Sequence, residues 1–166
     1  MSGNLQKMPV VYLDACFVSR LTGWVSSVEN RVKKEQLATL EVWRRMEGKV
    51  QAVVSELVWA EIDRGDPACA AQRTAAIAGL AMWPYSAEAS ALAAELLQAG
   101  AVRKEKPDDA LHIAMAAVGG ADVLLSWNFQ DIVNEKKMPE IKAVVERAGH
   151  CCPLITSPDK LPEDWP

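Results

Sequence analysis

The sequence Pro-Val-Val-Tyr-Leu-Asp-Ala-Cys, residues 9–16, predicts a buried strand that ends in a carboxylate. The apolar run is short and rich in β-branched and aromatic residues, which is typical of a strand inside a parallel sheet. Asp14 stands where this strand stops. Open α/β sheets bind ligands beyond the carboxyl ends of their strands, so Asp14 is a candidate active-site residue. The alternative is that Asp14 caps the next helix by accepting a backbone N–H.

Length and composition indicate one globular domain. The chain has 166 residues, of which 50% are hydrophobic and 24% charged, and a chain of this size buries a sizeable core without metal or disulfide staples. The formal net charge of -4 gives no global attraction for nucleic acid. Any binding of nucleic acid would therefore rely on a local basic patch or on metal ions.

We expect a cytoplasmic protein that does not enter a membrane. No apolar run approaches the ~18 residues that span a bilayer, and no signal sequence precedes Met8. The four cysteines lack CxxC spacing and are expected to be reduced thiols. Cys151 and Cys152 are adjacent, which is poor spacing for a tetrahedral zinc site with His150.

Strand and helix patterns alternate along the chain. Beyond the first strand, the predicted strands are 49–55, 80–85, 122–127 and 152–156, and the predicted helices are 17–23, 29–48, 55–63, 67–80, 87–99, 107–118 and 139–148. This alternation predicts a three-layer α/β/α sandwich with a mainly parallel sheet of four or five strands. We expect a flexible N-terminus at 1–8, the domain at 9–156 and a C-terminal tail at 157–166.

Four polar side chains are predicted to meet at one edge of this sheet. Asp14 follows the first strand, Glu61 lies in the helix after the second, Asp109 starts the helix before the fourth, and Asn128 follows the fourth. They converge if the first and fourth strands are neighbours across a switch point. Hard divalent cations prefer such oxygen ligands, and Mg²⁺ leaves room for phosphate oxygens of a substrate. Such ions activate water for hydrolysis.

Four segments resemble those of PIN-domain proteins, of the kind found as VapC-type toxins in bacterial toxin–antitoxin pairs. They are Val-Tyr-Leu-Asp at 11–14, Ser-Glu-Leu-Val-Trp-Ala-Glu-Ile at 55–62, Asp-Ala-Leu-His-Ile-Ala at 109–114 and Asp-Val-Leu-Leu-Ser-Trp-Asn-Phe at 122–129. Together they order most of the domain, from residue 9 to about 156. The resemblance implies an Mg²⁺- or Mn²⁺-dependent endoribonuclease that leaves a 5′-phosphate, with Asp14, Glu61 and Asp109 in its metal cluster. It also implies an RNA substrate, an antitoxin partner and a homodimer.

The fourth position of that cluster usually holds an acid and is Asn128 here. An amide can coordinate a metal through its oxygen but supplies no charge, which argues against full occupancy of a second ion. Asp131 could partly replace the missing charge. Alignment with the family motif selects Asp109 over its neighbour Asp108, which is left as a cap or outer acid.

Several alternatives stay open at this stage. Glu56 is a second candidate beside Glu61, with helix capping as its other role. We expect His112 to be a hydrogen-bonded core histidine instead of a general base. Trp24 and Trp43 are candidates for a partner interface. Base stacking would need basic residues interleaved with aromatic ones, and the sequence shows no such interleaving.

Two other enzyme classes fit the sequence less well. A haloacid-dehalogenase-like phosphatase needs a second Asp two residues after the first, where Cys16 stands. A dinucleotide-binding fold needs a glycine-rich turn after the first strand, and residues 15–18 contain no glycine. The main rival is a PIN-like module that has lost catalysis and acts by binding RNA or a protein partner, which Asn128 and the acidic composition favour.

Overall fold

The computed structural model describes residues 7–23 and 30–166 and contains a five-stranded parallel sheet. Its strands are β1 (Val10–Leu13), β2 (Gln51–Ser55), β3 (Ala81–Trp83), β4 (Val123–Leu125) and β5 (Leu154–Thr156). They lie in the order β3-β2-β1-β4-β5, and every neighbouring pair is parallel. The predicted parallel sheet is therefore confirmed.

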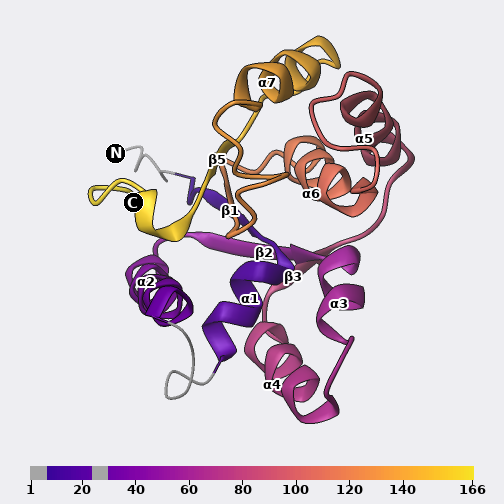
Figure 1. The fold of residues 1–166 in the computed structure, drawn as a ribbon. Coiled ribbons are helices and arrows are strands. Elements are labelled where there is room, and N and C mark those ends of the chain that lie inside the picture. Colours follow the sequence, from indigo (N-terminus) through magenta and orange to yellow (C-terminus); the bar gives the residue numbers. More distant parts are fainter. Residues whose placement is uncertain (1–6, 24–29) are drawn as a thin grey trace.

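Helices cover both faces of this sheet (Figure 1). They are α1 (Ala15–Thr22), α2 (Asn30–Met46), α3 (Glu56–Ile62), α4 (Pro67–Ile77), α5 (Ala87–Gln98), α6 (Pro107–Val118) and α7 (Met138–Arg147). Helices α1 to α4 lie on one face and α5 to α7 on the other. The predicted three-layer α/β/α sandwich is confirmed.

The direction of winding reverses at the centre of the sheet. From β1 the chain builds outward to β2 and β3, and it then returns through α5 and α6 to place β4 on the opposite side of β1. The helix layer changes at the same point (Figure 1). The carboxyl ends of β1 and β4 thus flank a topological switch point, where open α/β sheets place their ligand sites.

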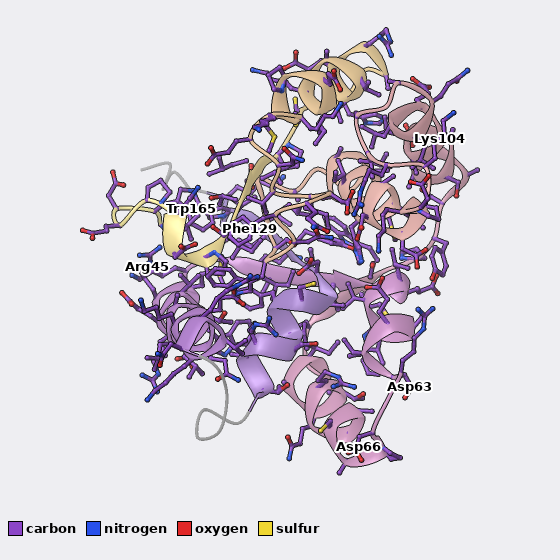
Figure 2. All side chains as sticks on the ribbon, viewed as in Figure 1. Arg45, Asp63, Asp66, Lys104, Phe129 and Trp165 are labelled. Atoms are coloured by element: carbon purple, nitrogen blue, oxygen red, sulfur yellow. The ribbon has the colours of Figure 1, made fainter. Side chains whose placement is uncertain are left out.

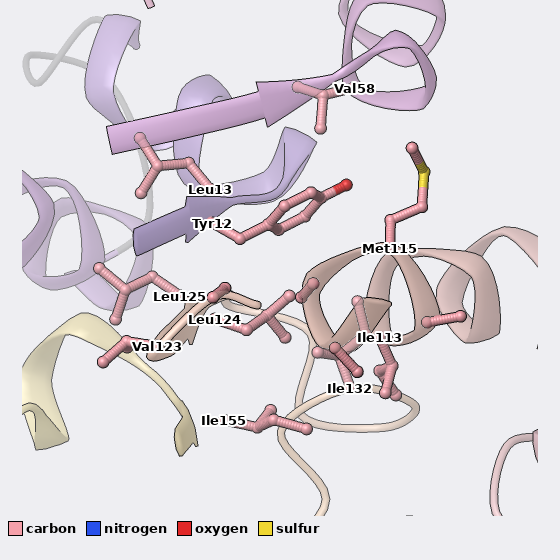
Figure 3. Packing of buried hydrophobic residues seen from close by; sticks show 14 of the residues in the cluster. Tyr12, Leu13, Val58, Ile113, Met115, Val123, Leu124, Leu125, Ile132 and Ile155 are labelled. Carbon is pink, nitrogen blue, oxygen red and sulfur yellow. The ribbon is translucent and has the colours of Figure 1, made fainter. Parts of the chain in front are cut away.

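Buried apolar side chains from the sheet and from α6 form the core (Figure 3). Tyr12 and Leu13 of β1, and Leu124 and Leu125 of β4, are inaccessible to solvent. Ile113 of α6 is equally buried, which agrees with a helix that is apolar nearly all round. Each such side chain contributes roughly 1.5–3 kcal/mol by burial. Strands β1 and β4, which end at the candidate site, are therefore held in a tightly packed core.

The segment after β5 packs onto α2, in the helical layer formed by α1 to α4. A 3₁₀ turn, η1 (Pro158–Lys160), contacts α2, and Leu161 joins the core at 4% exposure. Trp43 of α2 also packs against the core, with its ring centroid 6.3 Å from that of Phe17. Trp24 lies outside the described residues.

The four cysteines are free thiols. Among the described residues, no helix is both long and apolar enough to cross a membrane.

Candidate active site

Asp14 lies at the carboxyl end of the central strand and is only 1% exposed. The register of β1 with β4 pairs Leu13 with Leu125, so the next residue of β4, Ser126, stands beside Asp14. Ser126 Oγ donates a hydrogen bond of 2.5 Å to Asp14 Oδ2, and Phe17 N–H donates one of 2.9 Å to Oδ1. Asp14 is therefore both the N-cap of α1 and a carboxylate at the switch point.

Burial raises the pKa of Asp14 above its usual value. His112 and the two hydrogen bonds oppose that shift, and the charge of Glu61 adds to it. A buried carboxylate beside a second carboxylate favours either a proton or a cation. Asp14 thus has the electrostatic character of a cation ligand.

A buried hydrogen-bonded chain leads from β2 to Glu61. Tyr12 Oη lies 2.7 Å from Ser55 Oγ and 2.8 Å from His112 Nδ1, and His112 Nε2 lies 2.8 Å from Glu61 Oε2. His112 is 2% exposed, so it is the hydrogen-bonded core histidine that the sequence predicts. The chain fixes the ring of His112 and, through it, the carboxylate of Glu61.

The pKa of His112 is set by opposing effects. Burial alone would lower it, but the hydrogen bond and the negative charge of Glu61 raise it above its ordinary value, and Asp14 and Asp109 act in the same direction. Burial raises the pKa of Tyr12, so its hydroxyl stays neutral. A proton on the His112 imidazole therefore places a positive charge beside Glu61.

Asn128 contacts the third acid, Asp109, from the loop that follows β4. Asn128 Oδ1 accepts N–H bonds from Gln130 at 3.2 Å and from Asp131 at 3.1 Å. The Asn128 side chain also lowers the pKa of Asp109, against the rise that burial and the charge of Asp131 cause. Asn128 thus favours the charged form of Asp109.

Asp131 is paired with an arginine that the sequence analysis did not single out. Arg103 Nε donates to Asp131 Oδ1 and Nη2 to Oδ2, both at 2.7 Å. Asp131 is 3% exposed, and the hydrogen bonds from Arg103 lower its pKa. Asp131 is therefore ion-paired with Arg103, and its charge still raises the pKa of Asp109. The pair is 28 residues apart in sequence, and no local pattern indicates it.

The other two secondary candidates lie at the edge of the site. Asp108 is exposed in the first turn of α6, whereas Asp109 is half-buried, which agrees with the choice of Asp109 by alignment. Glu56 Oε2 accepts the N–H of Tyr85 at 2.7 Å. Glu56 therefore anchors the segment between β3 and α5.

The three principal acids act on the same two groups. Asp14, Glu61 and Asp109 all raise the pKa of the Cys16 thiol, after the larger effect of burial, and all raise that of His112. The negative charges of all three acids therefore act on the same two neighbouring side chains.

Some features of this site suit a metal ion and others do not. The concentration of buried oxygen donors suits a hard divalent cation. Within 7–23 and 30–166, however, no three His, Cys, Asp or Glu side chains are gathered as a metal-ligand group. Glu61 is turned toward His112 and Asp131 toward Arg103. The donor chemistry fits, and two of the acids are engaged by other partners.

No protein-family model matches the chain, and no curated protein sequence matches it. Solved structures do resemble it. One is VapC20 from Mycobacterium tuberculosis, a toxin that cleaves the sarcin–ricin loop, with a TM-score of 0.52, 15% identity, and coverage of 72% of this chain and 90% of that one.

A second is VapBC2 from Rickettsia felis, bound to a DNA fragment from its promoter, with a TM-score of 0.49, 13% identity, and coverage of 73% and 89%. At these identities the likeness concerns the fold, and function must be argued from the site. The chain has the PIN-domain fold of VapC-like proteins.

Proposed function

We propose that this protein is a divalent-metal-dependent endoribonuclease and the toxin of a toxin–antitoxin pair. The observation that carries the proposal is the placement of three acids near the switch point of a VapC-like fold. Glu61 hydrogen-bonds with His112, Asp109 lies one turn before His112 in α6, and Asp14 follows β1 beside β4. The resemblance of the sequence motifs supports the same activity. VapC20, which shares the fold, cleaves the sarcin–ricin loop, so a structured RNA is the substrate class to test first.

Each residue would have a distinct role in this activity. Asp14 and Asp109 would hold Mg²⁺ or Mn²⁺ together with Glu61; the bound ion would lower the pKa of a water molecule and neutralise charge on the leaving oxygen. Ser126 and the cap of α1 fix the Asp14 carboxylate. Asn128 would favour the charged form of Asp109, because its side chain lowers the pKa of that carboxyl group.

His112 would act through Glu61. It holds the carboxylate of Glu61 at 2.8 Å and is itself held by Tyr12, so it sets the position and charge of that acid. A protonated His112 offsets one negative charge of the cluster, whereas a neutral His112 does not. We therefore assign His112 a positioning role in place of a direct one.

Calorimetric titration with Mn²⁺ tests the proposal at the acids themselves. Asp14→Asn and Asp109→Asn should each weaken Mn²⁺ binding at least tenfold, because each removes a charge from the ligand set. Glu56→Gln is the matched control, because its carboxylate already accepts the Tyr85 N–H, and it should bind like the parent. Equal binding by the parent and by both Asn variants would refute a metal site at these acids.

A second function is favoured by the engagement of the acids. Glu61 and Asp131 are paired with His112 and Arg103, and Asn128 is uncharged. These features suit a PIN-like module that has lost catalysis and binds RNA or a protein partner. Such a module should show no Mn²⁺ binding at the acids, so the same titration separates the two functions.

The toxin assignment predicts two protein contacts. A small antitoxin should co-purify with the chain when the neighbouring small gene is expressed with it, and the chain should form a homodimer in sedimentation experiments. Expression without the antitoxin should inhibit growth of the host. A host that grows normally while the purified protein cleaves no RNA would contradict this assignment.

A further inference from the structure

A surface hollow of about 440 Å³ adjoins the turn that follows β4. It is lined by side chains from three elements that are distant in sequence: Arg31, Lys34 and Glu35 of α2, Trp127 and Phe129 after β4, and Asp159 of η1. Neither the proposed metal site nor the described core accounts for this combination of aromatic and basic groups.

The hollow belongs to the same edge of the sheet as the acids. Helix α2 leads into the start of β2, so its first turns lie toward the carboxyl ends of the parallel strands. Phe129 lies three residues after Ser126, the donor to Asp14 Oδ2, and directly after Asn128, whose side chain lowers the pKa of Asp109. Figure 2 labels Phe129 between the sheet and the C-terminal segment. A chain of nucleotides that reaches Asp109 would therefore pass close to this hollow.

Phe129 is an exposed aromatic ring with a rigid support. It is 39% exposed, and its ring meets that of Trp127 edge-on, with centroids 6.0 Å apart and planes at 64°. Trp127 is buried, and its indole N–H donates to Thr39 Oγ1 at 2.8 Å. An aromatic ring held in this way can stack with a base at little entropic cost, and stacking of this kind tolerates any sequence.

Two basic side chains, Arg31 and Lys34, line the hollow together with the Phe129 ring. Glu35 is paired with Arg20 at 2.7 Å and with Arg31 at 2.9 Å, so its charge is already balanced. Lys34 is exposed on the same helix. Asp159 is the opposing charge, and its Oδ1 accepts a hydrogen bond from Ser157. The local balance favours a phosphate, although the chain as a whole has a net charge of -4.

We infer that this hollow is a nucleotide subsite for single-stranded RNA, in which Phe129 stacks on a base and Arg31 and Lys34 contact a neighbouring phosphate. The inference rests on the proposed ribonuclease function and deepens it by naming a substrate contact. The basic and aromatic residues come from separate segments, so the subsite exists only after folding. This is why the sequence shows no interleaving of the two.

The test is the affinity for a fluorescein-labelled single-stranded RNA oligonucleotide, measured by fluorescence anisotropy in chelator so that no cleavage occurs. Phe129→Ala should weaken binding about 5- to 150-fold, as expected from roughly 1–3 kcal/mol per stacked base. Phe129→Tyr keeps the ring and should stay close to the parent. Met82→Ala is the control, because Met82 is also exposed, at 49%, but lies on the edge strand β3.

The phosphate contact is tested by charge and salt. Lys34→Gln should reduce the slope of log affinity against log salt concentration by roughly 0.7, the value for one phosphate contact on a single strand. Lys33→Gln is the matched control, because Lys33 is exposed on the same helix and does not line the hollow. Equal effects of the two substitutions would overturn the assignment of Lys34.

The outcomes also separate this inference from the proposed function. If the parent cleaves RNA and Phe129→Ala binds RNA as the parent does, the subsite is wrong and the nuclease stands. If binding depends on Phe129 but the parent cleaves nothing in Mn²⁺, the subsite stands and the nuclease is wrong. A parent without measurable affinity for single-stranded RNA overturns the subsite.

Discussion

Replacing Asp14 separates the effect of its charge from that of its hydrogen bonds. Asp14→Asn keeps an acceptor for the Phe17 N–H and a polar group beside Ser126, and it removes the buried charge. Because burial raises the pKa of Asp14, the charged form is disfavoured in the folded state. The metal-free Asp14→Asn variant should therefore be at least as stable as the parent at neutral pH.

The pH dependence follows from the sign of that shift. Below the ordinary pKa of 3.8, the carboxyl group is protonated in both states, and the charge makes no difference. As the pH rises through the raised folded pKa, the parent loses stability relative to Asp14→Asn. The advantage of the variant should therefore be small near about pH 4 and should reach a plateau above the folded pKa.

Asp14→Ala gives the magnitude of the hydrogen bonds. It removes the cap of α1, which costs about 1 kcal/mol, and it leaves the buried Ser126 hydroxyl without its acceptor, which costs about another 1 kcal/mol. The Ala variant should thus unfold about 4–8 °C below the Asn variant in a chain of this length. Urea and thermal unfolding in chelator measure both differences. An Asn variant as unstable as the Ala variant would refute the raised pKa and the retained cap.

Three further changes test the neighbouring contacts. Because Glu61 raises the pKa of His112, their ion pair contributes stability that is fully present below the ordinary His pKa of 6.5 and is lost as pH rises through the raised value. The difference between the urea midpoints of the parent and His112→Gln should therefore be larger in acid and should shrink at alkaline pH. Arg103→Met should lower the thermal midpoint at neutral pH, and this loss should vanish in acid, because Arg103 holds the pKa of its buried carboxylate partner low. Asn128→Asp places a like charge beside Asp109, so it should destabilise the metal-free protein and gain more in melting temperature from Mn²⁺ than the parent does.

The sequence was sufficient to predict the elements and their order, but not their limits. The second strand was expected from residue 49 and starts at Gln51, because the N–H groups of Lys49 and Val50 still bond to Met46 O at the end of α2. The convergence of the acids was predicted on the condition that the first and fourth strands are neighbours, and the pairing of β1 with β4 meets that condition. The position of Ser126 beside Asp14 could have been predicted, because it follows from the pairing of β1 with β4.

The side-chain contacts made by loop residues could not be predicted. Arg103 lies in the loop between α5 and α6, and its role depends on a carboxylate 28 residues away in sequence. The oxygen of Asn128 can coordinate a metal in principle, and in the structure it accepts two backbone N–H groups of the turn after β4. Such side-chain choices are set by the local backbone of a loop, which hydrophobic periodicity does not encode.

Cleavage of a structured RNA in Mn²⁺, with and without chelator, tests the central claim most directly. The parent should cut the RNA in Mn²⁺ and stop in chelator, Asp14→Asn and Asp109→Asn should be inactive, and Glu56→Gln should cut as the parent does. Cleavage that resists chelator, or full activity in Asp14→Asn, would contradict a metal-dependent nuclease centred on these acids.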